Sequence, residues 1–167
     1  MRLINASVNI DCLRPDCRLP SGPMDPVLKD AAPLNQALTL VLIFAASGVG
    51  ALLRYGLGIA LPHQAGQEIP SGTLVVNILG CAAIGIATEL FRGPLSIPEE
   101  YRLMITVGLL GGFTTASAFV FQTLELAEAG RYGKAVLYVA LTNGLCLAAG
   151  IAGHLATRAV FGLPGRG

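Results

Sequence analysis

Four long apolar blocks dominate the chain from residue 36 onward. They cover residues 36–61, 71–91, 103–122 and 135–156. Within them, the only side chains that are charged or that titrate near neutral pH are Arg54, Glu89 and His154. Each block reaches the roughly 20 residues that an α-helix needs to cross a hydrocarbon core of about 30 Å. Because the bilayer offers no water to satisfy backbone groups, the pattern predicts four transmembrane helices and an all-α integral membrane protein.

Composition agrees with this prediction. Hydrophobic residues make up 53% of the 167 positions and charged residues 13%, whereas a soluble domain usually has about 25% charged residues. The mean hydropathy is +0.66. The formal net charge is +1, so no basic face is large enough to indicate a nucleic acid as partner. Composition therefore excludes nucleic-acid binding and favours a lipid bilayer as the surroundings.

Residues 1–33 differ from the rest of the chain. They are rich in Pro and Asp, contain Cys12 and Cys17, and have no apolar run long enough for the core of a signal peptide. We expect a disordered N-terminal leader, or a segment upstream of a true start at Met24. Residues 34–167 are expected to form a single four-helix transmembrane domain with short connecting loops.

The cysteine and histidine positions do not form a recognisable catalytic or metal-binding pattern. Cys81 and Cys146 lie in the middle of apolar blocks, where cysteine usually behaves as a small hydrophobic residue. Cys12 and Cys17 lack both the spacing and the second ligand pair of a zinc site. His154 has no carboxylate close to it in sequence. We therefore expect no enzymatic activity.

The basic residues near the helix ends are distributed unevenly, but only weakly so. With four spans, one side of the membrane receives Lys29, Arg92, Arg102, Arg158 and Arg166, and the other receives Arg131 and Lys134. The excess favours the termini inside. Because the bias is small, insertion in both orientations is compatible with the sequence. Two oppositely inserted copies would form an antiparallel dimer, a symmetry that recurs in transport proteins.

The second block carries polar residues on one helical face. Thr73 and Asn77 are four residues apart, and Gly80 follows one turn later. An amide in a bilayer needs a partner, and its NH2 group is a natural donor to an anion. Hydrogen bonding to a neighbouring helix explains the same residue, with a free energy of about 0.6–2 kcal/mol per bond. Position alone leaves both interpretations open.

The third block contains a poor helix interior. Residues 111–115 read Gly-Gly-Phe-Thr-Thr. Glycine and the β-branched threonine both have low helix propensity. The glycines lie roughly 13 Å of helix beyond Arg102, so we expect a break near the membrane midplane. A break there would release backbone carbonyls, which coordinate small cations in carbonyl-lined sites. The alternative is that the glycines merely allow close helix packing.

The first and fourth blocks hold fewer polar groups. Arg54 lies roughly 10 Å from its helix end, where it could draw anions toward a pore mouth or extend to the interface. In the fourth block, Tyr138 and Asn143 could hydrogen-bond a permeant species. Its small residues at period four indicate a packing face, and they are Gly144, Ala148 and Ala152.

Three motifs occur together in order and spacing. They are Gly-x-Gly-Ala-x-x-Arg-Tyr at 48–55, Gly-Thr-Leu-x-Val-Asn-x-x-Gly-Cys at 72–81, and Gly-Gly-Phe-Thr-Thr-x-Ser-x-Phe at 111–119. With them the chain resembles the CrcB/Fluc family of fluoride ion channels over about residues 38–160. The resemblance implies a dual-topology antiparallel homodimer in the inner membrane, with two fluoride pores and a structural sodium ion at the dimer centre. Fluoride export would be passive.

The resemblance also implies roles for individual residues. Asn77 matches the pore amide, Phe119 the second of two pore phenylalanines, and Ser117 part of a polar track. The carbonyls of Gly111 and Thr114 match the sodium site. The expected pore residues are Asn77, Phe119, Ser117, Thr115, Thr73 and Tyr138, with Arg54 at the pore mouth or in a structural role. Fluoride is small and strongly hydrated, so donors must replace its water.

Two positions depart from the family pattern. The usual segment reads Thr-Thr-Phe-Ser-Thr-Phe, but here Ala116 replaces the first Phe and Ala118 the second Thr. The pore is then either altered but conducting, or completed by a paralogous subunit in a heterodimer. A small multidrug exporter is another reading, but it would need a carboxylate near the middle of the first helix. A purely structural subunit would not need the polar face of the second block.

Overall fold

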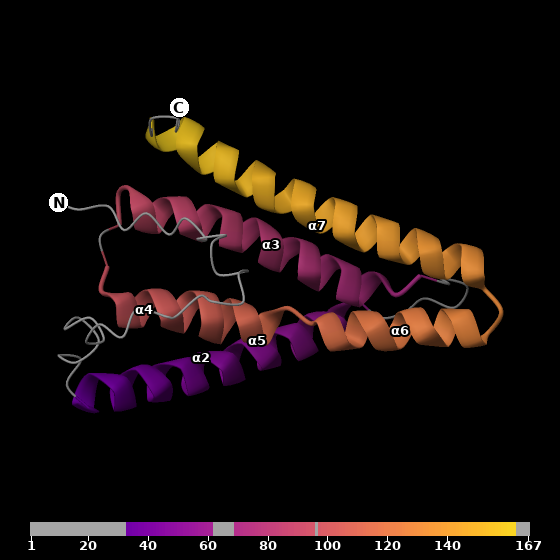
Figure 1. Cartoon of the computed structure of the whole chain (residues 1–167), viewed down its shortest axis with the longest axis horizontal. Coiled ribbons are helices and arrows are strands. Elements are labelled where there is room, and N and C mark those ends of the chain that lie inside the picture. Colours follow the sequence, from indigo (N-terminus) through magenta and orange to yellow (C-terminus); the bar gives the residue numbers. More distant parts are fainter. Residues whose placement is uncertain (1–32, 62–68, 96, 163–167) are drawn as a thin grey trace, which may run out of the picture. The chain divides into compact units, whose positions relative to one another are not determined.

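The computed structural model describes residues 33–61, 69–95 and 97–162. The predicted leader, residues 1–33, lies outside this range except for Pro33. The described elements are α2 (Pro33–Ala60), α3 (Ser71–Arg92), α4 (Glu99–Leu103), η2 (Met104–Leu110), α5 (Gly111–Phe113), α6 (Ala116–Glu128) and α7 (Tyr132–Phe161). Figure 1 shows their arrangement. The described chain is all-helical.

Four stretches of these elements are long and apolar enough to cross a membrane. They are Gln36–Ala60, Ser71–Arg92, Glu99–Glu128 and Tyr132–Phe161. The structure thus confirms four helices able to span a membrane, at the predicted places in the described chain. The third stretch is composite, because α4, η2, α5 and α6 follow one another within it.

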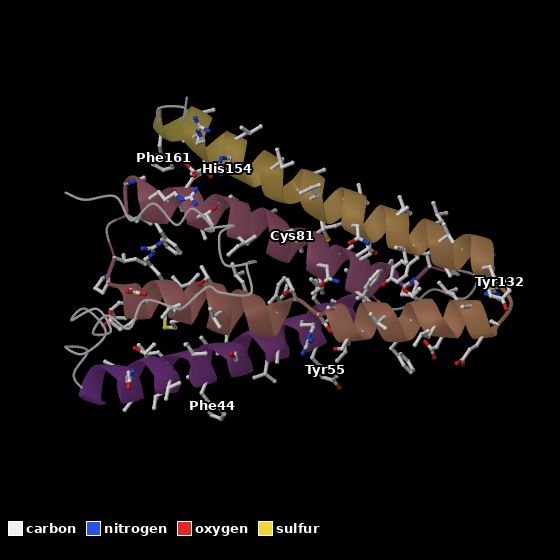
Figure 2. The ribbon with its side chains drawn as sticks, viewed as in Figure 1. Phe44, Tyr55, Cys81, Tyr132, His154 and Phe161 are labelled. Atoms are coloured by element: carbon white, nitrogen blue, oxygen red, sulfur yellow. The ribbon has the colours of Figure 1, made fainter. Side chains whose placement is uncertain are left out.

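Large apolar side chains cover the outside of the chain. Phe44 is 82% exposed and Tyr55 67%, and both point away from the other helices in Figure 2. The buried hydrophobic residues of the described part are few, namely Val76, Ala87, Leu126, Ala135 and Tyr138. In water such a surface would be strongly unfavourable, so lipid tails or another protein must cover it.

The closest helix contact joins α3 to α7, which run side by side (Figure 1). A Cβ added at Gly85 would collide with the carbonyl oxygen of Gly150, so no larger residue fits there. Gly153 approaches the backbone of Ala82 in the same way. Small residues allow this approach, as is common between membrane helices.

This contact does not use the small-residue stripe predicted from the sequence. Gly144, Ala148 and Ala152 are exposed, and nothing lies within 4 Å of a Cβ placed at Gly144. The face of α7 that packs on α3 instead carries Gly150 and Gly153. Gly150 and Gly153 are three residues apart, so the period-four spacing did not point to them.

The third span packs on α2 through glycine. A Cβ at Gly112 would lie 2.9 Å from Ser47 Cα, and one at Gly50 would lie 2.8 Å from Phe113 N. Gly111 is different, because the nearest atom to an added Cβ is Thr106 O at 3.9 Å. Of the two adjacent glycines, only Gly112 is required by this contact.

Candidate functional site

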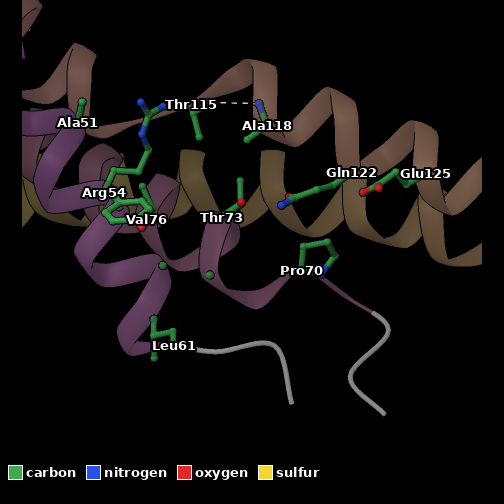
Figure 3. A pocket seen from close by; sticks show the side chains of 13 residues that line it. Ala51, Arg54, Leu61, Pro70, Thr73, Val76, Thr115, Ala118, Gln122 and Glu125 are labelled. Carbon is green, nitrogen blue, oxygen red and sulfur yellow. Dashed lines mark hydrogen bonds between the residues drawn. The ribbon is translucent and has the colours of Figure 1, made fainter. Parts of the chain in front are cut away.

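A cavity of about 550 Å³ lies between α2, α3 and α6. Its polar side chains come from all three helices (Figure 3) and are Arg54, Tyr55, Thr73, Thr115, Gln122 and Glu125. Three of these, Arg54, Thr73 and Thr115, were singled out from the sequence. The polar part of an otherwise largely apolar lining therefore consists mainly of groups that can donate hydrogen bonds, with one carboxylate among them.

Asn77 lies behind this cavity and holds Thr115 by two hydrogen bonds. Its Nδ2 donates to the Thr115 carbonyl at 3.1 Å, and the Thr115 N–H donates to Asn77 Oδ1 at 2.8 Å. Asn77 is 8% exposed. The bond between spans that the sequence left open is thus present. The amide has two N–H groups, and the bond to Thr115 uses one of them.

The backbone around Thr115 is extended rather than helical. Thr114 has φ −80° and ψ 158°, and Thr115 has φ −148° and ψ 113°. Gly111 keeps helical angles, with φ −64° and ψ −38°. The helical geometry of the third span therefore lapses at the two threonines and resumes at Ala116.

Two carbonyls lose their usual donors at this point. In a continuous helix Gly111 O would accept from the N–H of Thr115, but that group donates to Asn77. Thr114 O would likewise accept from Ala118, whose N–H instead donates to Thr115 Oγ1 at 3.1 Å. These are the two carbonyls that the family resemblance assigns to sodium. Carbonyl oxygens suit a hard monovalent cation, so the donor set fits.

Tyr138 is fully buried beneath the cavity. Its ring packs on Phe119 with centroids 5.4 Å apart, and its hydroxyl donates to Gln122 Oε1 at 2.8 Å. Because Oε1 accepts from Tyr138, the NH2 group of Gln122 is the part of the amide that remains for the cavity (Figure 3). Sequence reasoning missed Gln122. A polar residue one turn after Phe119, at the end of an apolar block, was the available signal.

Thr142 is a second residue that sequence reasoning missed. It lies one turn after Tyr138 on α7 and is 6% exposed. Its Oγ1 is buried and has no hydrogen-bond partner among the described residues. An unpaired buried hydroxyl costs about 1–3 kcal/mol in proteins, so a ligand that accepts a hydrogen bond would be favourable there.

The remaining predicted residues do not line the cavity. Ser117 is exposed and contacts Thr115 through their hydroxyl oxygens at 3.1 Å. Gly111 is also exposed, and Thr114 is half-buried with its hydroxyl donating to Leu110 O. The chain thus brings Arg54, the threonines of the cavity, Asn77, Phe119 and Tyr138 together. It leaves Ser117 and Gly111 on an open surface.

The residues of the candidate site fall within the part of the chain that matches a known protein family. Residues 41–154 match the family model described as CrcB-like protein, Camphor Resistance (CrcB). The chain belongs to the CrcB family. This confirms the resemblance drawn from the three motifs, and the four apolar helices agree with a multi-pass membrane protein.

Curated members of the CrcB family are similar over most of their length. A protein of Methylobacterium nodulans is 39% identical over 123 residues, covering 74% of this chain and 95% of the relative. One of Rhizobium johnstonii is 38% identical over 120 residues, covering 72% and 96%. One of Paramagnetospirillum magneticum is 40% identical over 121 residues, covering 71% and 94%. Each of the three is named Fluoride-specific ion channel FluC.

Proposed function

We propose that the chain is the subunit of a fluoride-selective channel that exports fluoride passively across the inner membrane. The observation that carries the proposal is the donor-lined cavity between α2, α3 and α6 in a chain whose relatives are named fluoride channels. Fluoride entering a cell as neutral HF dissociates inside. The negative-inside potential then drives the anion outward without any other energy source.

The cavity chemistry supports an anion as the permeant species. Fluoride accepts hydrogen bonds and donates none, so it can leave water only where several donors replace its hydration shell. The Arg54 guanidinium attracts the anion, and the hydroxyl of Thr73 on α3 and the NH2 of Gln122 on α6 offer hydrogens to it. Deeper in, the second N–H of Asn77 and the unpartnered hydroxyl of Thr142 continue the donor path.

We further propose that two copies assemble as an antiparallel homodimer with two pores. The weak basic asymmetry allows both orientations, and the small number of buried hydrophobic residues leaves wide apolar surfaces for a partner. Gly111 and Thr114 carry the carbonyls that would hold sodium. One chain offers two such oxygens, too few to replace a cation's hydration shell, so a second copy would complete the site. Sodium would act structurally by joining the copies.

Ala116 bears on the choice between a homodimer and a heterodimer with a paralogous subunit. It is exposed on the chain, so the missing aromatic ring would leave a gap at the surface where a partner would sit. We favour the conducting homodimer because Asn77, Phe119 and both carbonyl residues remain. Ala118 lines the cavity, so the missing Thr hydroxyl makes the cavity less polar without closing it.

An exporter of the small multidrug type is less well supported. Such proteins couple transport to a carboxylate within the first span, where this chain has only Arg54. The one carboxylate inside a predicted span, Glu89, is held by Arg92 and His154. A proton-coupled cycle would need a carboxylate that is free to bind and release a proton.

The deciding experiment is fluoride efflux from proteoliposomes, with chloride as the competing anion. The purified protein should discharge a fluoride gradient and leave a chloride gradient intact. Folded protein without fluoride-selective flux would contradict the homodimer. Co-expression with a paralogous subunit would then test the heterodimer.

A further inference from the structure

Glu89 is a buried carboxylate outside the cavity. It is 7% exposed and lies on the last turn of α3. Its Oε1 accepts from Arg92 Nη1 at 3.1 Å and lies 3.3 Å from His154 Nδ1. Arg92 belongs to the same helix and cannot constrain another one. His154 belongs to α7, so this contact ties the two helices at one end.

The contact belongs to a regular series that we call the α3–α7 seam. Its members are the pairs Cys81–Cys146, Gly85–Gly150 and Glu89–His154, and the same offset places Tyr138 at the level of Thr73. In every pair the α7 residue follows the α3 residue by the same number of positions, so the helices are parallel and in constant register. Figure 2 shows Cys81 between the two helices, with His154 further along. The same offset sets Thr142 at the level of Asn77.

The middle of the seam specifies this register through backbone contacts alone, where Gly85 lies against Gly150 and Gly153 against Ala82. Gly85 and Gly150 touch through backbone atoms, and the neighbouring Cys81 and Cys146 are small. A slip by one turn that sets Cys146 against Gly85 would again oppose small residues there, and it would add only the Cβ of Ala149 where Gly153 now meets Ala82. Buried polar groups are best known for fixing such a register, as a single Asn does in a coiled coil.

The polar ends of the seam distinguish the possible registers. A slip by one turn in one direction would bring Gly150 to Glu89 and leave the buried carboxylate without its partner on α7. A slip in the other direction would bring Arg158 to Glu89 but would force the His154 ring against Gly85, where the backbones already touch. It would also remove Tyr138 from Thr73.

We propose that the Glu89–His154 contact sets the register of α7 on α3 and thereby positions Tyr138 and Thr142 against the cavity. Glu89 and His154 are positioning residues, because neither lines the cavity of the candidate site. Their effect on flux rests on the proposed fluoride conduction. Their effect on register does not, and it can be measured separately.

The native cysteine pair provides the register measurement. In a background with Cys12→Ser and Cys17→Ser, a short bis-methanethiosulfonate should link Cys81 to Cys146 in membranes, and mass spectrometry gives the rate. The variants Glu89→Gln and His154→Leu should lower this rate by about threefold or more, the scale on which changes within a packed network alter coupling. Fluoride flux should fall in the same two variants.

The controls separate register from general damage. Glu99→Gln removes an exposed carboxylate from the neighbouring α4 and should leave both linking and flux unchanged. His154→Gln retains a hydrogen-bond donor and should stay close to the parent, which keeps the test open if His154→Leu folds poorly. The exchange Glu89→His with His154→Glu should restore linking and flux together.

An unchanged linking rate in Glu89→Gln and His154→Leu would overturn the register role. A lowered linking rate with normal flux would overturn the positioning of the cavity. If the parent protein passes no fluoride, the proposed function fails, while the linking rates still decide the register.

Discussion

Asn77 on α3 makes the hydrogen bonds to the Thr115 backbone that neighbouring residues would make in a continuous helix. It accepts the Thr115 N–H at 2.8 Å and donates to the Thr115 carbonyl at 3.1 Å, so one side chain satisfies both backbone groups of an extended residue. The pair also lies against the cavity through Thr115. A change at Asn77 should therefore affect folding and anion flux together.

Replacing Asn77 by Asp should abolish fluoride flux. The substitution removes the Nδ2 donor, sets a carboxylate against the Thr115 carbonyl, and places a negative charge beside an anion path. The lost bond to a buried carbonyl should lower the free energy of unfolding by about 1–3 kcal/mol. Efflux and thermal unfolding would be measured with Asn143→Asp as control, because Asn143 is exposed and bonds only within α7. Normal efflux in Asn77→Asp would remove this residue from the mechanism.

Replacing Gln122 by Met should reduce flux and leave the fold intact. Met has a similar length but offers no NH2 to the cavity and no acceptor to the Tyr138 hydroxyl. The orphaned hydroxyl should lower the free energy of unfolding by about 1–3 kcal/mol. Tyr138→Phe is the matched variant, since it frees Gln122 from its partner but keeps the NH2 group. If Gln122→Met conducts as well as the parent protein, the amide is not a donor to the ion.

Gly112 and Gly111 should respond differently to alanine. In Gly112→Ala the added Cβ meets the backbone of Ser47, so overpacking should destabilise the chain by about 1–3 kcal/mol. In Gly111→Ala the added Cβ makes only an ordinary van der Waals contact, with Thr106 O at 3.9 Å, and the backbone at this position has helical angles. It should be neutral or stabilising by about 0.5–1 kcal/mol. Thermal unfolding of the two proteins gives the comparison, and equal melting temperatures would contradict the contact with α2.

Replacing sodium by a large organic cation should weaken the proposed dimer. The carbonyls of Gly111 and Thr114 would then face one another across the interface without a cation between them. Monomer and dimer fractions in membranes, measured by subunit capture at several protein densities, should shift toward monomer. Potassium provides the control for ionic strength. A dimer fraction independent of sodium would argue against a structural ion.

The four helices were predictable because long apolar blocks have few alternatives in a bilayer. The block at 36–61 corresponds to α2, and the bounds differ by a few residues at the termini. The extended residues of the third span were harder to locate. Two glycines suggested the weak point, yet both stay helical, and the change comes at Thr114 and Thr115. The deciding partner, Asn77, lies on another helix, where local propensity has no influence.

The candidate site was predictable where a polar residue stood alone in an apolar block, as with Asn77. Gln122 was missed because it is the last residue of the apolar block at 103–122. A polar residue at the end of such a block usually indicates the start of a loop. His154 has no carboxylate near it in sequence, but the fold supplies Glu89 at 3.3 Å. Such pairings depend on how far one helix is shifted along another. The spacing of apolar residues within a helix does not predict this shift.

The polar partners of α3 also set an order for the biogenesis of the protein. Asn77 leaves the ribosome before Thr115, and Glu89 leaves it before His154. At about 5–20 residues per second, the ribosome leaves these groups without their later partners for several seconds. During that interval α3 must keep its amide and carboxylate near the translocation machinery or close to the headgroups. Release into the lipid would therefore be completed only when α7 emerges, and a chain truncated before α7 should be retained by the insertion machinery or degraded.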